Sequence, residues 1–155
     1  MNFNRKDVVT GLIIILLIIG GAYLYRYLKK PRTQTPTPSP ASFEFRKDLE
    51  DSFKLDIPDN VNSIELKDVS GGDGRGIATD KEILVDANDP EAGYFYQAWL
   101  ENSGKLIPLS KLQIAKGGWI ANYDRTKYPE YKKLIISLEK VNDNKIEKII
   151  LEGSF

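Results

Sequence analysis

The pattern of apolar and polar residues divides the chain into distinct parts. Residues 8–24 contain no charged residue, and the apolar character continues to Leu28. Proline then alternates with threonine and serine, and from Phe43 onward short apolar runs alternate with turn residues. We therefore predict four parts: a short cytoplasmic tail at 1–7, a transmembrane helix at 8–28, a basic and Pro/Thr-rich linker at 29–42, and a β-domain at 43–155.

The apolar segment has the length of a membrane span. An α-helix rises about 1.5 Å per residue, so residues 8–28 would cover roughly 31 Å, which is about one hydrocarbon core. Tyrosines and cations follow, as at a membrane interface: Tyr23, Tyr25, Arg26, Tyr27, Lys29 and Lys30. We expect a single-pass helix that makes the lipid bilayer a partner of the chain.

The alternative interpretation of this segment is a cleaved secretory signal peptide. Arg5 and Lys6 form a basic start, and an apolar stretch follows them, as in such peptides. However, the stretch is longer than a typical signal core, and no A-x-A-like cleavage site comes after it. The transmembrane helix is therefore favoured.

Residues 31–42 have the composition of a spacer. Their alternating prolines disfavour a helix and favour an extended, semi-rigid chain that reaches about 35 Å in a polyproline-like conformation. The spacer would hold the following domain away from the bilayer.

Eight runs beyond the linker have the composition of β-strands. They alternate between apolar and polar residues or are β-branched, and clusters of Gly, Asn, Asp and Pro separate them. The predicted strands are Ser63–Val69, Arg75–Thr79, Glu82–Ala87, Tyr94–Glu101, Ile107–Gln113, Trp119–Tyr123, Lys133–Glu139 and Lys145–Leu151.

This spacing predicts a mainly β fold, an antiparallel β-sandwich with Greek-key-like connections. Two segments are ambiguous: residues 44–55 fit a short helix or a first strand, and residues 127–132 fit a helical turn or a loop. The strand around Trp99 is apolar on both faces, which indicates a central position. We expect Trp99 to be buried against the opposite sheet, with Ile136 or Leu138 beside it.

Composition excludes several kinds of chemistry. The 155-residue chain contains no cysteine and no histidine. Disulfides and thiolate metal sites are therefore absent, and so are Ser-His and Cys-His nucleophile arrangements. About 115 residues beyond the linker suffice for one domain with one core.

The zero net charge conceals an asymmetry along the chain. Residues 1–40 carry six Lys/Arg and one Asp, whereas residues 41–155 carry sixteen Lys/Arg and twenty-one Asp/Glu. The cations would thus lie beside the membrane, where anionic headgroups attract them. The acidic balance of the domain argues against a nucleic-acid partner.

The second half of the chain carries short motifs in a characteristic order. A Tyr-x-x-Trp-Leu strand precedes a glycine turn, a leucine-containing strand, a glycine-rich hairpin, a strand ending in Leu-Glu and a last strand closing with glycine. These motifs are Tyr96–Leu100, Gly104, Leu109, Gly117–Gly118, Ile136–Glu139 and Ile149–Gly153. In this order, residues 63–155 resemble the C-terminal domain of the anti-sigma-K factor family.

The resemblance implies a bacterial membrane protein with a β-sandwich outside the cell. It also implies structural roles for Tyr96, Trp99, Leu100, Gly104, Leu138, Glu139 and Gly153. In that family a cytoplasmic domain holds a sigma factor until proteolysis releases it. Here seven residues precede the apolar segment, no His/Cys zinc motif is present, and Asn144–Ile146 replaces the usual proline. The outer domain and anchor carry over, whereas sigma sequestration does not.

Two polar features have simple interpretations. The loop Ser70–Gly76 is rich in glycine but fits neither phosphate-binding pattern, so we interpret it as a hairpin. The acidic residues Asp73, Asp80, Asp86, Asp89 and Glu91 lack a calcium-loop frame and are interpreted as solvated turns. No cofactor, metal site or catalytic residue is predicted.

The sequence therefore indicates a non-enzymatic, membrane-anchored extracytoplasmic domain with an interaction or sensory role and a protein partner. Charge counting alone favours a cytoplasmic domain, because more cations follow the apolar segment than precede it. The spacer and the resemblance favour the outside. The alternatives are a cell-envelope enzyme that uses carboxylates on glycan or peptide, and a subunit of a membrane complex with helix contacts at Gly20–Ala22.

Overall fold

The structure, a computed structural model, describes residues 40–54, 56–58 and 60–155. The predicted tail at 1–7, the transmembrane helix at 8–28 and nearly all of the linker at 29–42 lie outside the described residues. Within the described part of the chain, neither helical segment is long and apolar enough to cross a membrane.

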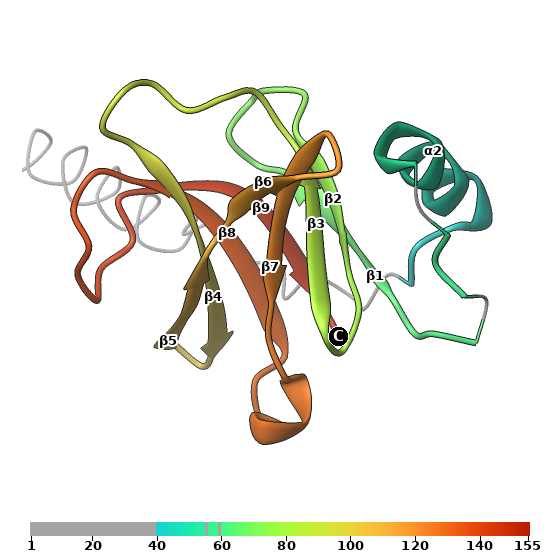
Figure 1. The fold of residues 1–155 in the computed structure, drawn as a ribbon. Coiled ribbons are helices and arrows are strands. Elements are labelled where there is room, and N and C mark those ends of the chain that lie inside the picture. Colours follow the sequence, from blue (N-terminus) through green and yellow to red (C-terminus); the bar gives the residue numbers. More distant parts are fainter. Residues whose placement is uncertain (1–39, 55, 59) are drawn as a thin grey trace, which may run out of the picture. The chain divides into compact units, whose positions relative to one another are not determined.

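The described domain is mainly β, which confirms the fold class in its coarser form. Nine strands form a single antiparallel sheet in the order β5-β4-β8-β9-β1-β2-β3-β7-β6 (Figure 1). The strands are β1 (Ile64–Asp68), β2 (Arg75–Ala78), β3 (Glu82–Asp86), β4 (Phe95–Asn102), β5 (Lys105–Lys111), β6 (Gln113–Ala115), β7 (Gly118–Asn122), β8 (Lys133–Glu139) and β9 (Lys148–Ser154).

The sheet is barrel-like and nearly closed, where we expected two facing sheets. Its two edge strands, β5 and β6, are separated along the chain by Leu112 alone. The backbone N–H of Leu112 donates to the carbonyl of Tyr96 on β4 at 2.9 Å, and β6 then pairs with β7. The continuous segment from β5 through Leu112 to β6 thus supplies both edge strands of the sheet. This arrangement leaves little free strand edge.

The interior of this barrel-like sheet is filled from alternate positions of the strands. Leu100 and Leu134 are paired across β4 and β8 and are both fully buried. Other fully buried members of the same cluster are Leu66, Ala78, Ile83, Val85, Ala98, Ile136 and Leu151. Burial of this apolar surface is the main force that holds the strands together.

Residues Phe43–Phe53 form the helix α2, so the helical alternative for 44–55 is confirmed and the strand is wrong. The Ser42 side chain caps its start by accepting a hydrogen bond from the backbone N–H of Phe45. Lys54 ends it in the left-handed conformation. In the second ambiguous region, 127–132, the loop alternative is confirmed, because the 3-10 turn η1 (Arg125–Lys127) ends at its first residue and no helix follows through residue 132.

Helix α2 packs on the outer face of the sheet through Leu49 and Phe53. These side chains contact apolar residues on β2, β3 and β7, namely Ile77, Leu84 and Ile120. Gly118 permits the close approach, because a Cβ atom there would lie 2.0 Å from the Phe53 ring. The packed helix holds its first turn, with Arg46, beside the cleft described below.

Trp99 is 1 % exposed, which confirms its predicted burial. Its predicted neighbours are wrong, because its partner across β4 and β8 is Ile135. Ile136 and Leu138 pair with Ala98 and Tyr96 and therefore lie on the other face of the sheet. Trp99 belongs to neither of the two apolar clusters found among the described residues.

Candidate functional site

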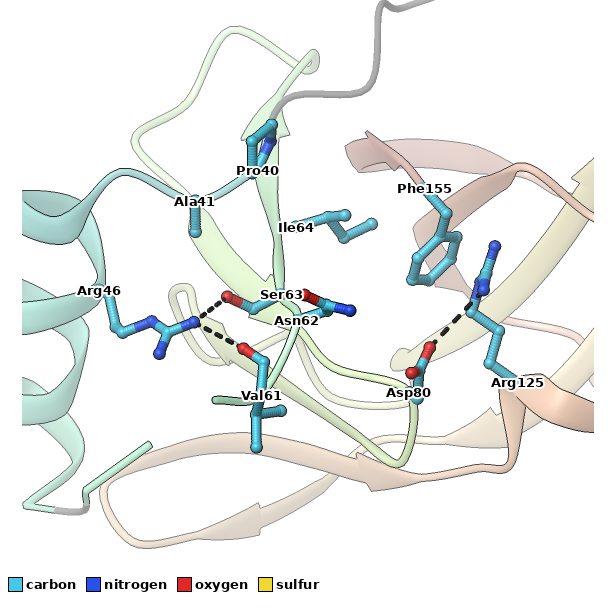
Figure 2. A pocket seen from close by; sticks show the side chains of 10 residues that line it. All are labelled: Pro40, Ala41, Arg46, Val61, Asn62, Ser63, Ile64, Asp80, Arg125 and Phe155. Carbon is cyan, nitrogen blue, oxygen red and sulfur yellow. Dashed lines mark hydrogen bonds and ion pairs between the residues drawn. The ribbon is translucent and has the colours of Figure 1, made fainter. Parts of the chain in front are cut away.

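A cleft of about 410 Å³ opens where the chain passes from α2 into β1 (Figure 2). Five residues supply apolar or aliphatic walls: Pro40, Ala41, Val61, Ile64 and Phe155. The other five are polar or charged: Arg46, Asn62, Ser63, Asp80 and Arg125. The cleft thus combines apolar walls with a few polar groups, as ligand sites commonly do.

Arg46 forms one side of the cleft and holds α2 to the segment before β1. Its Nη2 atom donates to the carbonyl of Val61 at 2.8 Å and to Ser63 Oγ at 2.7 Å. Its Nη1 atom donates to the carbonyl of Pro58 at 3.1 Å. All of these acceptors are neutral, and no carboxylate among the described residues forms an ion pair with Arg46.

Arg125 forms the opposite side of the cleft, on η1. Its guanidinium lies 4.0 Å from the centroid of the Phe155 ring, which is a cation–π arrangement. Its Nη1 atom is 3.6 Å from the carboxylate of Asp80, whose side chain is 48 % exposed. Its Nε atom is buried and has no hydrogen-bond partner among the described residues. The arginine is thus held in place by stacking but is only loosely paired.

The backbone around Arg125 is fixed by the neighbouring turns. The Arg125 N–H donates to the carbonyl of Asp80 at 3.0 Å. Asp124 caps η1 through Thr126 and accepts a hydrogen bond from Lys81 Nζ at 2.7 Å. Donation by the Lys81 and Thr126 side chains lowers the pKa of Asp124 to about 2. This network attaches η1 to the β2–β3 turn.

Asn62 is exposed on the segment that separates the two arginines. Its amide points into the cleft, toward the side formed by Asp80 and Arg125 (Figure 2). A second cleft of about 500 Å³ shares Val61, Asn62 and Asp80 with the first and continues toward Lys81 and Glu82 on the turn into β3. The segment before β1 is therefore open to solvent on two sides.

The first cleft is lined by few groups that could act as acids or bases. Among its described lining residues Asp80 is the single carboxylate, and it faces a guanidinium. Hydrolysis of a glycoside by paired carboxylates needs two such groups across the scissile bond. Two guanidinium groups, an amide and apolar walls instead suit the recognition of a ligand.

The seven residues singled out by the family resemblance do not gather at this cleft. Tyr96 and Leu100 face the interior, and the Tyr96 hydroxyl donates to the carbonyl of Asn88 at 2.8 Å. Gly104 has a φ of 84° in the β4–β5 turn, a conformation that favours glycine. At Gly153 a Cβ atom would lie 2.6 Å from the Glu65 carbonyl oxygen.

The other motif residues lie along β4 and β8. Trp99 and Glu139 are buried, and Leu138 is partly buried against the interior cluster. The Glu139 carboxylate accepts a hydrogen bond from the backbone N–H of Glu147 at 3.1 Å. Burial raises the pKa of Glu139, and the negative charges of Glu147 and Asp143 raise it further, against opposing hydrogen bonds.

The glycine-rich loop at Ser70–Gly76 joins β1 to β2, which confirms the hairpin interpretation. Its backbone N–H groups turn inward: those of Ser70, Gly71 and Gly72 donate to Asp68 Oδ1 at 2.8, 2.8 and 3.0 Å. Burial raises the pKa of Asp68, but these hydrogen bonds outweigh it and hold the pKa below its ordinary value. The donors of these three residues are therefore already occupied by a carboxylate.

The acidic residues considered for calcium are distributed over separate places. Asp86 pairs with Arg75 at 3.1 Å, and Asp80 pairs with Arg125. Asp73 precedes β2 and Asp80 follows it, so the strand separates them. Over the residues that the structure describes, no three acidic side chains come together as a metal site would require.

Sequence analysis missed the cleft, because its residues range from position 40 to position 155 and share no local pattern. Neither Arg46 nor Arg125 stands in a recognisable motif. In the comparisons with known proteins, no family model, no curated protein and no solved structure matches the chain.

Proposed function

We propose that the chain is a membrane-tethered extracytoplasmic domain that binds a partner and carries out no catalysis. The observation that carries the binding role is the open cleft between Arg46 and Arg125, whose polar groups suit recognition and include one carboxylate. The proposed interaction or sensory role is the one that the resemblance to the outer domain of anti-sigma-K factors implies.

The proposed tether rests on the sequence before the domain. Residues 8–24 are uncharged, and the Pro/Thr-rich spacer leads to Pro40, which already forms a β-bridge with Ile64. Pro40, at the start of the described residues, thus contacts β1. An apolar helix at 8–28 would hold the domain at a bilayer surface with its N-terminal tail inside the cell.

Carbonate washing and cysteine labelling test the tether and its orientation. The chain lacks cysteine, so single substitutions give unambiguous positions. We expect the protein to stay with membranes after carbonate washing. Lys145→Cys, at an exposed position of the domain, should react with an impermeant maleimide in intact cells. The matched variant Asn4→Cys should react only after lysis.

Other outcomes would identify the alternatives. A soluble protein with a new N-terminus near Ala22 would establish the signal peptide. Labelling of Asn4→Cys in intact cells, with protection of Lys145→Cys, would place the domain in the cytoplasm. Either result would overturn the proposed arrangement.

A further inference from the structure

We propose that the cleft between Arg46 and Arg125 binds a carboxylate attached to a small apolar group. This inference rests on the proposed binding role and names the chemistry of the ligand. Three independent features of the cleft support it: an excess of positive charge, an incompletely paired guanidinium, and apolar walls of limited size.

The charge excess follows from the partners of the two arginines. The charged side chains that line the cleft are two guanidinium groups and one carboxylate, so its side chains carry a net positive charge. Within the described residues, the hydrogen bonds of Arg46 all end on neutral oxygens, so none of them joins its charge to a carboxylate. Because the surrounding walls are apolar and polarise weakly, the positive potential would favour an anion over a neutral ligand.

Arg125 is the group that would meet the anion. Its contact with Asp80, at 3.6 Å, is longer than a hydrogen bond, and the Asp80 side chain is half exposed. A guanidinium binds a carboxylate best through two parallel hydrogen bonds at shorter distance. A ligand carboxylate would therefore compete with Asp80 for the Arg125 guanidinium.

The walls limit the apolar part of the ligand. A volume of about 410 Å³ lies near the lower end of the range for small-molecule sites. Ile64 and Val61 supply apolar surface in the cleft, and the Phe155 ring lies beside the Arg125 guanidinium. These dimensions suit one side chain of leucine or phenyl size next to the carboxylate.

Such a carboxylate has two sources, a free small acid or the C-terminus of a peptide that ends in an apolar residue. Calorimetric titration of the full-length chain in detergent micelles distinguishes them. The probes are N-acetyl-leucine and an acetylated heptapeptide that ends in leucine, each compared with its C-terminal amide. We expect each acid that binds to do so at least about tenfold more tightly than its amide, since a charge-assisted hydrogen bond is lost in the amide.

The two acids together assign the source. Similar affinities for both would assign a free small acid, whereas much tighter binding of the heptapeptide would assign a peptide C-terminus. Equal affinities of both acids and their amides, or no binding of either acid, would overturn the proposal.

Variants on the two sides of the ion pair should change affinity in opposite directions. Arg125→Gln should weaken binding of the acid about tenfold or more. Asp80→Asn should strengthen it several-fold, because it removes the competing carboxylate and leaves the Asp80 backbone contact intact. General damage to the fold would weaken binding in both variants, so weaker binding by Asp80→Asn would contradict the proposal.

A third variant tests the cleft without altering either charged group. Asn62→Trp places a bulky ring in the cleft from an exposed position, so it should abolish binding of the acid while the protein stays folded. Lys145→Trp, at an exposed position that does not line the cleft, is the matched control and should bind normally. Unchanged binding by Asn62→Trp would exclude this cleft, and membrane retention and labelling would remain a separate test of the tether.

Discussion

The indole Nε1 of Trp99 donates a hydrogen bond to Ser137 Oγ at 2.7 Å. The two residues are diagonal neighbours on β4 and β8, because Trp99 pairs with Ile135 and Ser137 pairs with Gln97. Both side chains are buried, at 1 % and 0 % exposure. A buried indole N–H needs an acceptor, and a serine placed two residues beyond the direct partner supplies it.

Trp99→Phe should reduce the free energy of unfolding by about 1 kcal/mol beyond its loss of apolar contact, because the hydrogen bond to Ser137 disappears. A double-mutant cycle with Ser137→Ala, measured by chemical denaturation, should give a coupling of about 1 kcal/mol. Trp119→Phe with Ser137→Ala is the matched control, since Trp119 faces Tyr96. Equal coupling in both cycles would show that this hydrogen bond contributes nothing specific.

Gly118→Ala should destabilise the protein by about 1–3 kcal/mol, because the added methyl group would collide with the Phe53 ring. Replacing the Phe53 ring by the smaller leucine side chain should relieve the collision. The double variant Phe53→Leu/Gly118→Ala should therefore be more stable than the sum of the two single changes predicts. Thermal and denaturant unfolding of the four proteins measures this. Additive effects would mean that α2 does not pack on β7 in this way.

Glu139→Gln should change how stability depends on pH. The pKa of Glu139 is raised in the folded protein, so the folded state holds its proton more strongly than the unfolded state. The ordinary pKa of a glutamate is 4.5, and below this pH the protonated carboxyl of Glu139 contributes its full stability to the folded protein. This stability is lost as the pH rises through the pKa of Glu139 in the folded state. As the pH rises through this range, the wild type should therefore lose stability relative to Glu139→Gln.

Denaturation midpoints at a series of pH values measure this difference. The matched control is Glu130→Gln, at an exposed position, which should follow the wild type. A difference between wild type and Glu139→Gln that stays constant from pH 4 to pH 8 would show that Glu139 does not titrate abnormally.

Asp124→Asn should have the opposite pH dependence. Because the Lys81 and Thr126 side chains lower the pKa of Asp124 to about 2, its ionised form stabilises the folded protein. That stability is present above its ordinary pKa of 3.8 and is lost as the pH falls toward about 2. The variant should thus be less stable than wild type at pH 7, and the difference should vanish near pH 2.

Acid unfolding followed by circular dichroism tests this expectation. Asp51→Asn, at an exposed position of α2, is the control. If the deficit of Asp124→Asn persisted unchanged at pH 2, the capping network around η1 would not depend on the charge of Asp124.

Much of the local structure is predictable from the sequence. Alternation of apolar and polar residues located eight of the nine strands, including Lys133–Glu139 with identical bounds, and missed β6. The spacing of Leu49 and Phe53 allowed a helix, and Ser42 supplies the cap that begins it. These signals are local, since they depend on neighbours within a few residues.

The sequence by itself determined the uncharged segment at 8–24, the charge asymmetry, the absence of cysteine and histidine, and the mainly antiparallel β character of the domain. The tertiary structure decided which face of β4 is interior, because both faces of that strand are apolar and alternation cannot choose between them. It also decided the closure at Leu112 and the cleft at Arg125. Both join residues far apart in the chain, and such contacts are set by packing and strand register, which leave no local pattern in the sequence.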